Sequence, residues 1–190
     1  MAFRFKKLRI PDVVLIEPEL HADERGFFTE IHKASEFEEN KVPCRFVQSS
    51  YSRSRKGVLR GLHYQAEPMA QGKLVRVVSG RIFDVAVDLR KNSRSFARWV
   101  GAELSEENGD MLWVPEGFAH GFLALEDDTR VLYQFTREYS KEHSRGIVWN
   151  DPGIKIEWPV KDPILSEKDR ALPGLSSAVA EGSKTHTRKE

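Results

Sequence analysis

The 190-residue chain is long enough for one domain that buries most of its unfolded surface without disulfides or metals. Its formal net charge of +1 gives no field that would attract nucleic acid or a membrane surface. The single cysteine cannot form a disulfide within the chain, no apolar run could span a membrane, and the basic N-terminus lacks an apolar signal segment. We therefore expect a soluble cytoplasmic protein.

Hydrophobic residues recur mostly with a period of two, which is typical of β-strands. Short strands at regular spacing, separated by turn residues, predict an all-β antiparallel barrel or sandwich. The predicted strands are 13–17, 27–31, 46–52, 73–79, 81–89, 99–104, 111–114, 119–126 and 129–139.

The segment 81–89 shows the alternation most clearly. Phe83, Val85, Val87 and Leu89 share one face, and two aspartates, at positions 84 and 88, lie on the other. Ser79-Gly80 immediately precedes this strand and predicts a tight hairpin to the strand before it.

Helix signals are few. Ser35 is placed to cap a short helix over 36–39, and 105–108 reads as one isolated turn. From Asn150 onward, repeated X-Pro steps favour an extended strap laid over the barrel. The small and polar residues 176–190 predict a disordered tail, which leaves residues 1–175 as a single domain.

Two glycine-rich stretches carry the chemistry-bearing residues. The segment 109–122 has the spacing Gly-x5-Pro-x-Gly-x2-His, which resembles the second motif of the cupin superfamily, and 57–63 matches the Gly-x5-His of its first motif. The next position of that first motif, a histidine in metal-binding cupins, is Gln65 here. His63 and His120 alone are too few ligands for a zinc or iron site. We therefore expect no metal site, and histidines that are available to carry protons.

The chain resembles the dTDP-4-dehydrorhamnose 3,5-epimerase family in several motifs that occur in the same order from about Pro18 to Pro173. The matching segments are 23–30, 46–48 with Ser52, 56–65, 71–73, 84–90, 115–122 and 165–169. The resemblance implies an antiparallel jelly-roll barrel, a homodimer, no cofactor, and a nucleotide-linked 4-keto-6-deoxyhexose as substrate.

Inversion of a carbon beside a carbonyl needs a base on one face, an acid on the other, and donors that hold the enolate oxygen between the two steps. Histidine suits the base because its pKa lies near working pH. The resemblance implies that His63 is this base, that Asp169 orients it, and that Tyr133 returns the proton. It also implies that Lys73 stabilises the enolate or keto oxygen.

Each of these residues has a structural alternative. Ser166-x-x-Asp169 could be a helix-start capping box, and an aspartate can serve both as cap and as partner of the base. Tyr133 could be an aromatic core residue, and Lys73 a solvated charge at a strand end. His120 could be a core histidine with its hydrogen bonds satisfied.

The remaining site residues come from the resemblance. Arg25 and Arg60 would hold the diphosphate and sugar through forked hydrogen bonds. The other predicted substrate contacts are Glu30, Gln48, Ser50, His120, Tyr139 and Lys168. Tyr133 and Tyr139 share strand parity, so both should face the same side.

Three positions leave questions open. Arg60 and His63 would face opposite sides of a regular strand, so they share a site only if Gly61 marks a bulge, or if Arg60 reaches a partner subunit. The family commonly has asparagine at Ser50 and glutamate at Ser144, both expected near the nucleotide. The proton-transfer residues are intact, but the sequence does not settle which nucleotide is bound or which sugar carbons are inverted.

The sequence therefore predicts an epimerase acting at carbons 3 and 5 of dTDP-4-dehydro-6-deoxy-glucose, in dTDP-rhamnose and polysaccharide biosynthesis. The alternatives are a 3-epimerase, a non-catalytic sugar-nucleotide-binding cupin, and a metal-dependent cupin oxygenase. Neither nucleic acid nor a membrane is an expected partner.

Overall fold

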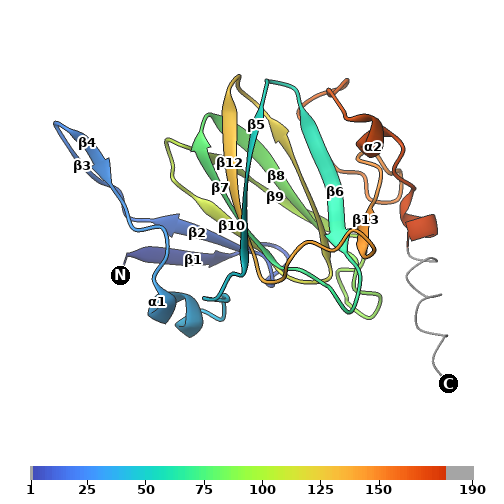
Figure 1. The fold of residues 1–190 in the computed structure, drawn as a ribbon, viewed down its shortest axis with the longest axis horizontal. Helices are drawn as coiled ribbons and strands as arrows, with labels where there is room; N and C mark the ends of the chain where they lie inside the picture. Colours follow the sequence, from blue (N-terminus) through green and yellow to red (C-terminus); the bar gives the residue numbers. More distant parts are fainter. Residues whose placement is uncertain (1, 179–190) are drawn as a thin grey trace.

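The computed structural model describes residues 2–178, and Figure 1 shows how its elements are arranged. The helices α1 (Ala34–Glu39) and α2 (Glu167–Arg170) are short. The strands are β1 (Phe3–Lys7), β2 (Val14–Pro18), β3 (His21–Asp23), β4 (Gly26–Phe28), β5 (Gln48–Ser54), β6 (Leu59–Gln65), β7 (Lys73–Ser79), β8 (Arg81–Asp88), β9 (Trp99–Ser105), β10 (Met111–Val114), β11 (Phe118–Ala124), β12 (Thr129–Phe135) and β13 (Ser144–Gly146).

Two antiparallel sheets pack face to face and form the predicted jelly-roll barrel. One has six strands in the order β1-β2-β10-β7-β12-β5, and the other has five in the order β13-β6-β11-β8-β9. Alternate side chains of both sheets point inward and make the main apolar core, which includes Val75, Phe118, Phe122 and Val131.

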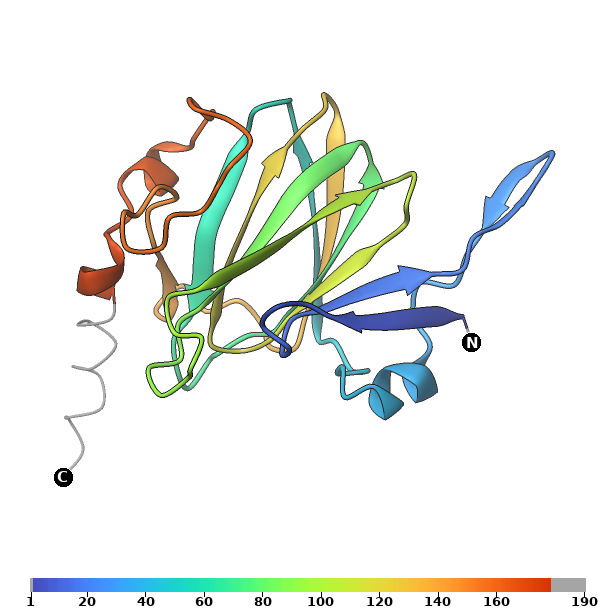
Figure 2. The same cartoon turned by 180° about the vertical axis from the view of Figure 1, so that it is seen from behind.

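A second apolar layer covers the outside of the five-stranded sheet. Val85 and Val87 of β8 pack there with Ile154 of the C-terminal segment, and Phe83 contacts Trp158 edge to face. Figure 2 shows this segment, coloured orange to red, beside β6. The predicted strap is therefore present, and it buries the apolar face of β8 from outside the barrel.

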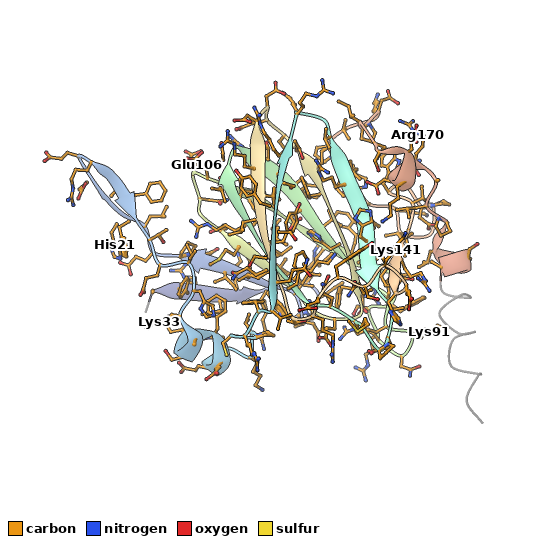
Figure 3. The ribbon with its side chains drawn as sticks, in the orientation of Figure 1. His21, Lys33, Lys91, Glu106, Lys141 and Arg170 are labelled. Carbon is orange, nitrogen blue, oxygen red and sulfur yellow. The ribbon has the colours of Figure 1, made fainter. Side chains whose placement is uncertain are left out.

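The β3–β4 hairpin, hereafter the arm, projects away from the barrel (Figure 1). Figure 3 shows His21 on this arm, far from the side chains that fill the space between the sheets. Phe27 and Phe28 of the arm are 53% and 67% exposed. No described helix has the length and apolar character needed to cross a membrane.

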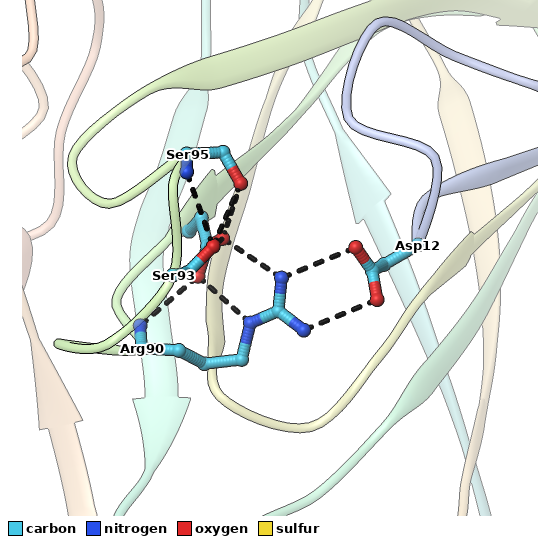
Figure 4. Close-up of polar contacts among 5 residues, drawn as sticks. Asp12, Arg90, Ser93 and Ser95 are labelled. Atoms are coloured by element: carbon cyan, nitrogen blue, oxygen red, sulfur yellow. Dashed lines mark hydrogen bonds and ion pairs between the residues drawn. The ribbon is translucent and has the colours of Figure 1, made fainter.

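Figure 4 shows polar contacts made by Arg90, Ser93, Ser95 and Asp12. Asp88, the last residue of β8, has a fully buried side chain and takes part in the same network. Its carboxylate accepts hydrogen bonds from Arg90, Ser93 and Ser95, and Arg90 also forms a two-pronged pair with Asp12. Burial opposes the charge on Asp88, but these donors outweigh it and lower its pKa to about 2.

Several strand predictions match the structure closely, and the bounds of β7 and β10 agree to the residue. The predicted hairpin at Ser79-Gly80 is wrong, because β7 and β8 belong to different sheets. Gly80, at φ +77°, turns the chain from one sheet to the other, and a Cβ there would lie 2.6 Å from the Thr129 hydroxyl oxygen. A tight glycine turn can join facing sheets as well as paired strands.

Other predicted boundaries need correction. The strand predicted over 27–31 ends at Phe28, and the one predicted over 129–139 ends at Phe135. Ser35 is not a helix cap, because α1 starts at Ala34 after Lys33, without a side-chain cap. Ser176 to Ala178 are helical and Ala178 is buried, so the predicted disordered tail does not start at Ser176. The rest of that predicted tail, 179–190, lies outside the described residues.

Candidate active site

A cavity of about 340 Å³ opens between the two sheets and is lined by most of the predicted site residues. Its lining consists of Ser50, Arg60, His63, Lys73, His120, Phe122, Tyr133, Phe135, Ser166, Lys168 and Asp169. Hollows of about 650 and 680 Å³ elsewhere have no histidine in their linings. The smaller cavity is therefore the one equipped for proton transfer.

His63 and Asp169 form a hydrogen-bonded pair although they are 106 residues apart in the chain. His63 Nε2 lies 2.6 Å from Asp169 Oδ1, and the aspartate side chain is almost fully buried. Burial alone would raise the pKa of Asp169, but the hydrogen bond and charge of His63 outweigh it, and the pKa is lowered. The neutral tautomer that donates Nε2–H to Asp169 carries its lone pair on Nδ1, the atom that could accept a proton.

Asp169 also takes part in the start of α2, so the two readings of this residue are both realised. The Ser166 hydroxyl oxygen accepts a hydrogen bond of 3.0 Å from the Asp169 backbone N–H. This is the N-cap contact that the Ser-x-x-Asp spacing predicts. The cap fixes the backbone of Asp169 while its carboxylate reaches His63.

Gly61 resolves the parity conflict between Arg60 and His63. In the register of β6 against β11, His63 pairs with His120 and Arg60 pairs with Phe122, so two residues of β6 stand opposite one of β11. Of the two alternatives that the sequence leaves open, the structure therefore has the bulge at Gly61. A side chain is excluded there, because φ is +132° and a Cβ would lie 2.6 Å from the Gly121 Cα. Arg60 and His63 thus line the same cavity of one chain.

Lys73 and His120 lie on the inner side of the cavity. Lys73 is 8% exposed, and its ammonium donates a 3.1 Å hydrogen bond to the backbone oxygen of His63. Burial lowers the pKa of Lys73 to about 8, although the nearby Asp84 carboxylate opposes this shift. His120 is 4% exposed, and its Nε2 lies 2.7 Å from Asp84 Oδ1. Lys73 is therefore not a solvated charge at a strand end, and both side chains point into the cavity.

Tyr133 enters the cavity from the sheet opposite His63. Its strand, β12, belongs to the six-stranded sheet, whereas β6 belongs to the five-stranded one. The phenol oxygen lies 3.1 Å from the Ser52 hydroxyl, and the ring stacks on Phe135. Burial raises the pKa of Tyr133, with the hydrogen bond from Ser52 as a smaller opposing effect. The phenol is therefore protonated at neutral pH and can act as a proton donor.

The outer part of the cavity carries positive charge. Arg60 and Lys168 are both exposed, and Arg60 is held by hydrogen bonds to the Ser54 hydroxyl and the Arg53 backbone oxygen. Ser50 stands directly opposite Tyr133 in the β5–β12 ladder and also lines the cavity. Arginine and lysine at the mouth of such a cavity suit an anionic ligand group.

Four predicted substrate contacts do not line this cavity. Arg25 lies in the turn of the arm and pairs with Asp23, and Glu30 is exposed just beyond the arm. Gln48 accepts a 2.7 Å hydrogen bond from the backbone N–H of Tyr139, whose side chain is 56% exposed. Tyr133 and Tyr139 do not share a face, because the strand ends at Phe135 before it reaches the second tyrosine.

Gln65 has its side chain fully engaged elsewhere. Its amide nitrogen donates to the backbone oxygens of Met69 and Glu138, and its amide oxygen accepts from the backbone N–H of Ser140. The residue that replaces a metal-ligand histidine of cupins therefore ties β6 to the loop after β12.

The structure adds site residues that the sequence reasoning did not assign. Phe122 and Phe135 supply apolar wall, Ser166 caps α2, and Asp84 holds His120 from behind the cavity. The alternation in 81–89 placed Asp84 opposite the apolar residues of its strand, and that polar position inside an apolar barrel strand was the available signal.

Comparison with known proteins gives one consistent result. The family model for dTDP-4-dehydrorhamnose 3,5-epimerase matches residues 7–177. The dTDP-4-dehydrorhamnose 3,5-epimerase of Shigella flexneri is 57% identical over 166 residues, which cover 86% of this chain and 91% of that protein.

Solved structures agree with this match. The dTDP-6-deoxy-D-glucose-3,5-epimerase of Legionella pneumophila, in complex with dTDP-4-keto-L-rhamnose, superposes with a TM-score of 0.90 at 44% identity and covers 95% of this chain and 96% of that one. A 3'-monoepimerase from Streptomyces bikiniensis, in complex with dTDP-quinovose, superposes with a TM-score of 0.85 at 28% identity. The match covers 96% of this chain and 98% of that one.

Proposed function

The chain belongs to the dTDP-4-dehydrorhamnose 3,5-epimerase family, and on that premise we propose that it inverts carbons 3 and 5 of dTDP-4-dehydro-6-deoxy-glucose. The product is dTDP-4-dehydro-rhamnose, a precursor for polysaccharide. One observation carries this proposal. His63, paired with Asp169, and the Tyr133 phenol line a single cavity from opposite sheets, and Lys73 and His120 also line it.

Each inversion begins with removal of a proton from the carbon beside the keto group. His63 takes this proton on Nδ1, and Asp169 stabilises the imidazolium that forms. Positioned acid–base catalysis of this kind typically contributes about 10²–10⁴-fold in rate. The short hydrogen bond of 2.6 Å supports the orienting role of Asp169.

The second half of each inversion returns a proton to the opposite face of the same carbon. Tyr133 suits this step because its phenol is protonated and comes from the facing sheet. Lys73 and His120 donate to the oxygen that carries the negative charge between the two steps. Arg60 and Lys168, with Ser50, contact the phosphate and sugar at the outer part of the cavity.

The test is proton NMR of dTDP-4-dehydro-6-deoxy-glucose with the protein in heavy water. We expect deuterium at carbons 3 and 5 and conversion to the rhamno product. Deuterium at carbon 3 alone would assign the chain to the 3-epimerases, and ligand binding without any exchange would make it a binding protein.

We further propose that the single domain predicted over residues 1–175, extended here to the buried Ala178, acts as one epimerase domain. We also propose that the protein works in the cytoplasm and that two copies form the active unit. The arm supports the dimer, because an isolated two-stranded hairpin is at best marginally stable, and Phe27 and Phe28 are exposed on it. Arg25 and Glu30 would then contact substrate in the partner's cavity rather than in their own. The combination of an inactive His63→Ala chain with an inactive Arg25→Ala chain tests this, because mixed dimers would regain activity in one of their two cavities.

A further inference from the structure

Asp84 is a buried carboxylate, and neither packing nor strand pairing explains why a charged side chain stands at this position. It lies on β8 between Phe122 of β11 and Ala102 of β9, and it is 0% exposed. Its neighbours on the inward face of β8, Ile82 and Ala86, belong to the main apolar core. Placing a carboxylate in such surroundings is costly unless charge and hydrogen bonds compensate for the lost water.

The compensation inside the protein is incomplete. Asp84 Oδ1 lies 2.7 Å from His120 Nε2, whereas Oδ2 is buried without a hydrogen-bond partner among the described residues. A buried oxygen without a partner is uncommon in native proteins and calls for an explanation. A residue whose only role was to tie β11 to β8 could do so with a neutral side chain at lower cost.

Proton-bearing groups next to Asp84 give its charge a role. His120 contacts it directly, and the Asp84 charge also acts on Lys73 and Tyr133, which line the cavity in front of it. Asp84 itself does not line the cavity. Its carboxylate therefore stands behind the side chains that face a ligand, and it can affect a reaction only through them.

The chemistry of His120 depends on this partner. With Nε2–H donating to Asp84, a neutral His120 ring has only an acceptor on Nδ1, whereas an imidazolium has a donor there. Stabilisation of an enolate oxygen requires a donor. A buried imidazolium beside a lysine ammonium is unfavourable unless a negative charge lies against it.

We infer that Asp84 is a positioning residue of the active site: its carboxylate holds the His120 ring through Nε2 and supplies the negative charge that lets His120, as a cation beside Lys73, face the substrate's keto oxygen. This inference rests on the proposed epimerase function for its catalytic consequence. Its electrostatic content, a charged His120 ring, does not depend on that function.

The first test is the substitution Asp84→Asn, which keeps the shape of the side chain and an acceptor for Nε2–H but removes the charge. We expect kcat to fall by about 10²-fold, the loss typical for one missing oxyanion donor, with dTDP affinity unchanged within about twofold. Asp88→Asn is the matched control, because Asp88 is equally buried on the same face of the same strand. This control should lower thermal stability and leave kcat unchanged.

A double-substitution cycle separates positioning from general damage to the fold. If Asp84 acts through His120, Asp84→Asn should reduce kcat by less than about threefold in a His120→Gln background. A full additional loss in that background, or an Asp84→Asn enzyme with wild-type kcat, would overturn the inference.

The second test needs no variant of Asp84 and no turnover. Nitrogen-15 NMR of the wild-type ring, assigned by loss of its signals in His120→Gln, should show an imidazolium at pH 7 with dTDP bound. A neutral ring would refute the inference even if Asp84→Asn failed to fold. A charged ring in a protein that did not epimerise would refute the proposed function and leave the role of Asp84 standing.

Discussion

His63 and His120 stand directly opposite each other on the neighbouring strands β6 and β11, and each is held by its own aspartate. Opposed side chains on adjacent strands lie about 4.5–5.5 Å apart at Cβ, so both imidazoles can reach one bound sugar. Their surroundings differ. The His63 side chain is 34% exposed and pairs with the strap, whereas the His120 side chain is 5% exposed and pairs with β8. The exposed ring suits a base that exchanges protons, and the buried ring suits a fixed donor.

His63→Ala should abolish exchange of the substrate's carbon-bound hydrogens in heavy water, because no other group in the cavity has both the position and the basicity of this imidazole. The expected loss is about 10²–10⁴-fold. NMR measures the exchange, and calorimetry with dTDP checks that the nucleotide still binds. Retained exchange at both carbons would remove His63 from the mechanism.

Ser166→Ala should reduce both stability and turnover, because this hydroxyl caps α2 and fixes the backbone that carries Asp169. The lost cap should lower the free energy of unfolding by about 1 kcal/mol. Kinetic assays should show a lower kcat with an unchanged KM, since Ser166 acts through Asp169 and His63. Ser166→Thr retains the hydroxyl and should restore most of the activity, and failure of this rescue would argue against the cap.

The lowered pKa of Lys73 predicts how activity and stability change at alkaline pH. Its pKa of about 8 in the folded protein means that the ammonium loses its proton as pH rises through 8, so kcat/KM should fall there. The unfolded chain keeps the ordinary value of 10.5 and therefore binds more protons between pH 8 and 10.5, so stability should rise with pH across this window. Lys73→Met should abolish this rise in stability and leave only slow, pH-independent turnover near pH 8. Urea unfolding at several pH values and steady-state kinetics measure the two effects.

The lowered pKa of Asp88 predicts how the free energy of unfolding changes at acid pH. Its pKa of about 2 lies below the ordinary 3.8, so its contribution is complete above pH 3.8 and is lost as pH falls from there through 2. Asp88→Asn should lower the free energy of unfolding at pH 7 by roughly 3 kcal/mol, because Arg90 and two serines lose their charged acceptor. The difference from the wild type should shrink toward pH 2. An equal difference at pH 2 and pH 7 would show that the charge is not the cause.

Local hydrophobic patterns were enough to predict most strands and the class of fold, because the apolar residues of β12 recur with a period of two and β10 is a short continuous apolar run. The pattern in β8 did not indicate which of its faces points into the barrel, because both faces are buried. Val85 and Val87 lie under the strap, and Asp84 points into the barrel. The strand β13 was missed because it has only three residues and pairs with β6, far earlier in the chain. The strand β1, which pairs with the neighbouring β2, was missed as well.

The site was predictable in part. The parity conflict between Arg60 and His63 pointed to Gly61 as a possible bulge, and the structure has that bulge, which brings both side chains to one cavity. The pairing of His63 with Asp169 came only from the family resemblance, because no local pattern links residues 106 positions apart. Arg25 lies outside its own chain's cavity because the arm carries it away from the barrel. A single sequence does not show which contacts belong to another copy.

Tyr133→Phe should separate the two halves of the reaction. The substitution removes the hydroxyl that lies 3.1 Å from Ser52 but keeps the ring that stacks on Phe135, so the fold and the cavity wall should persist. Proton removal depends on His63 and should continue, whereas delivery to the opposite face should fail. We therefore expect deuterium to enter substrate that is recovered with its original configuration, with little inverted product. Ser52→Ala is the matched control, since it removes the other partner of the same hydrogen bond and should leave inversion largely intact. Normal yield of inverted product from Tyr133→Phe would transfer the donor role to another group or to water.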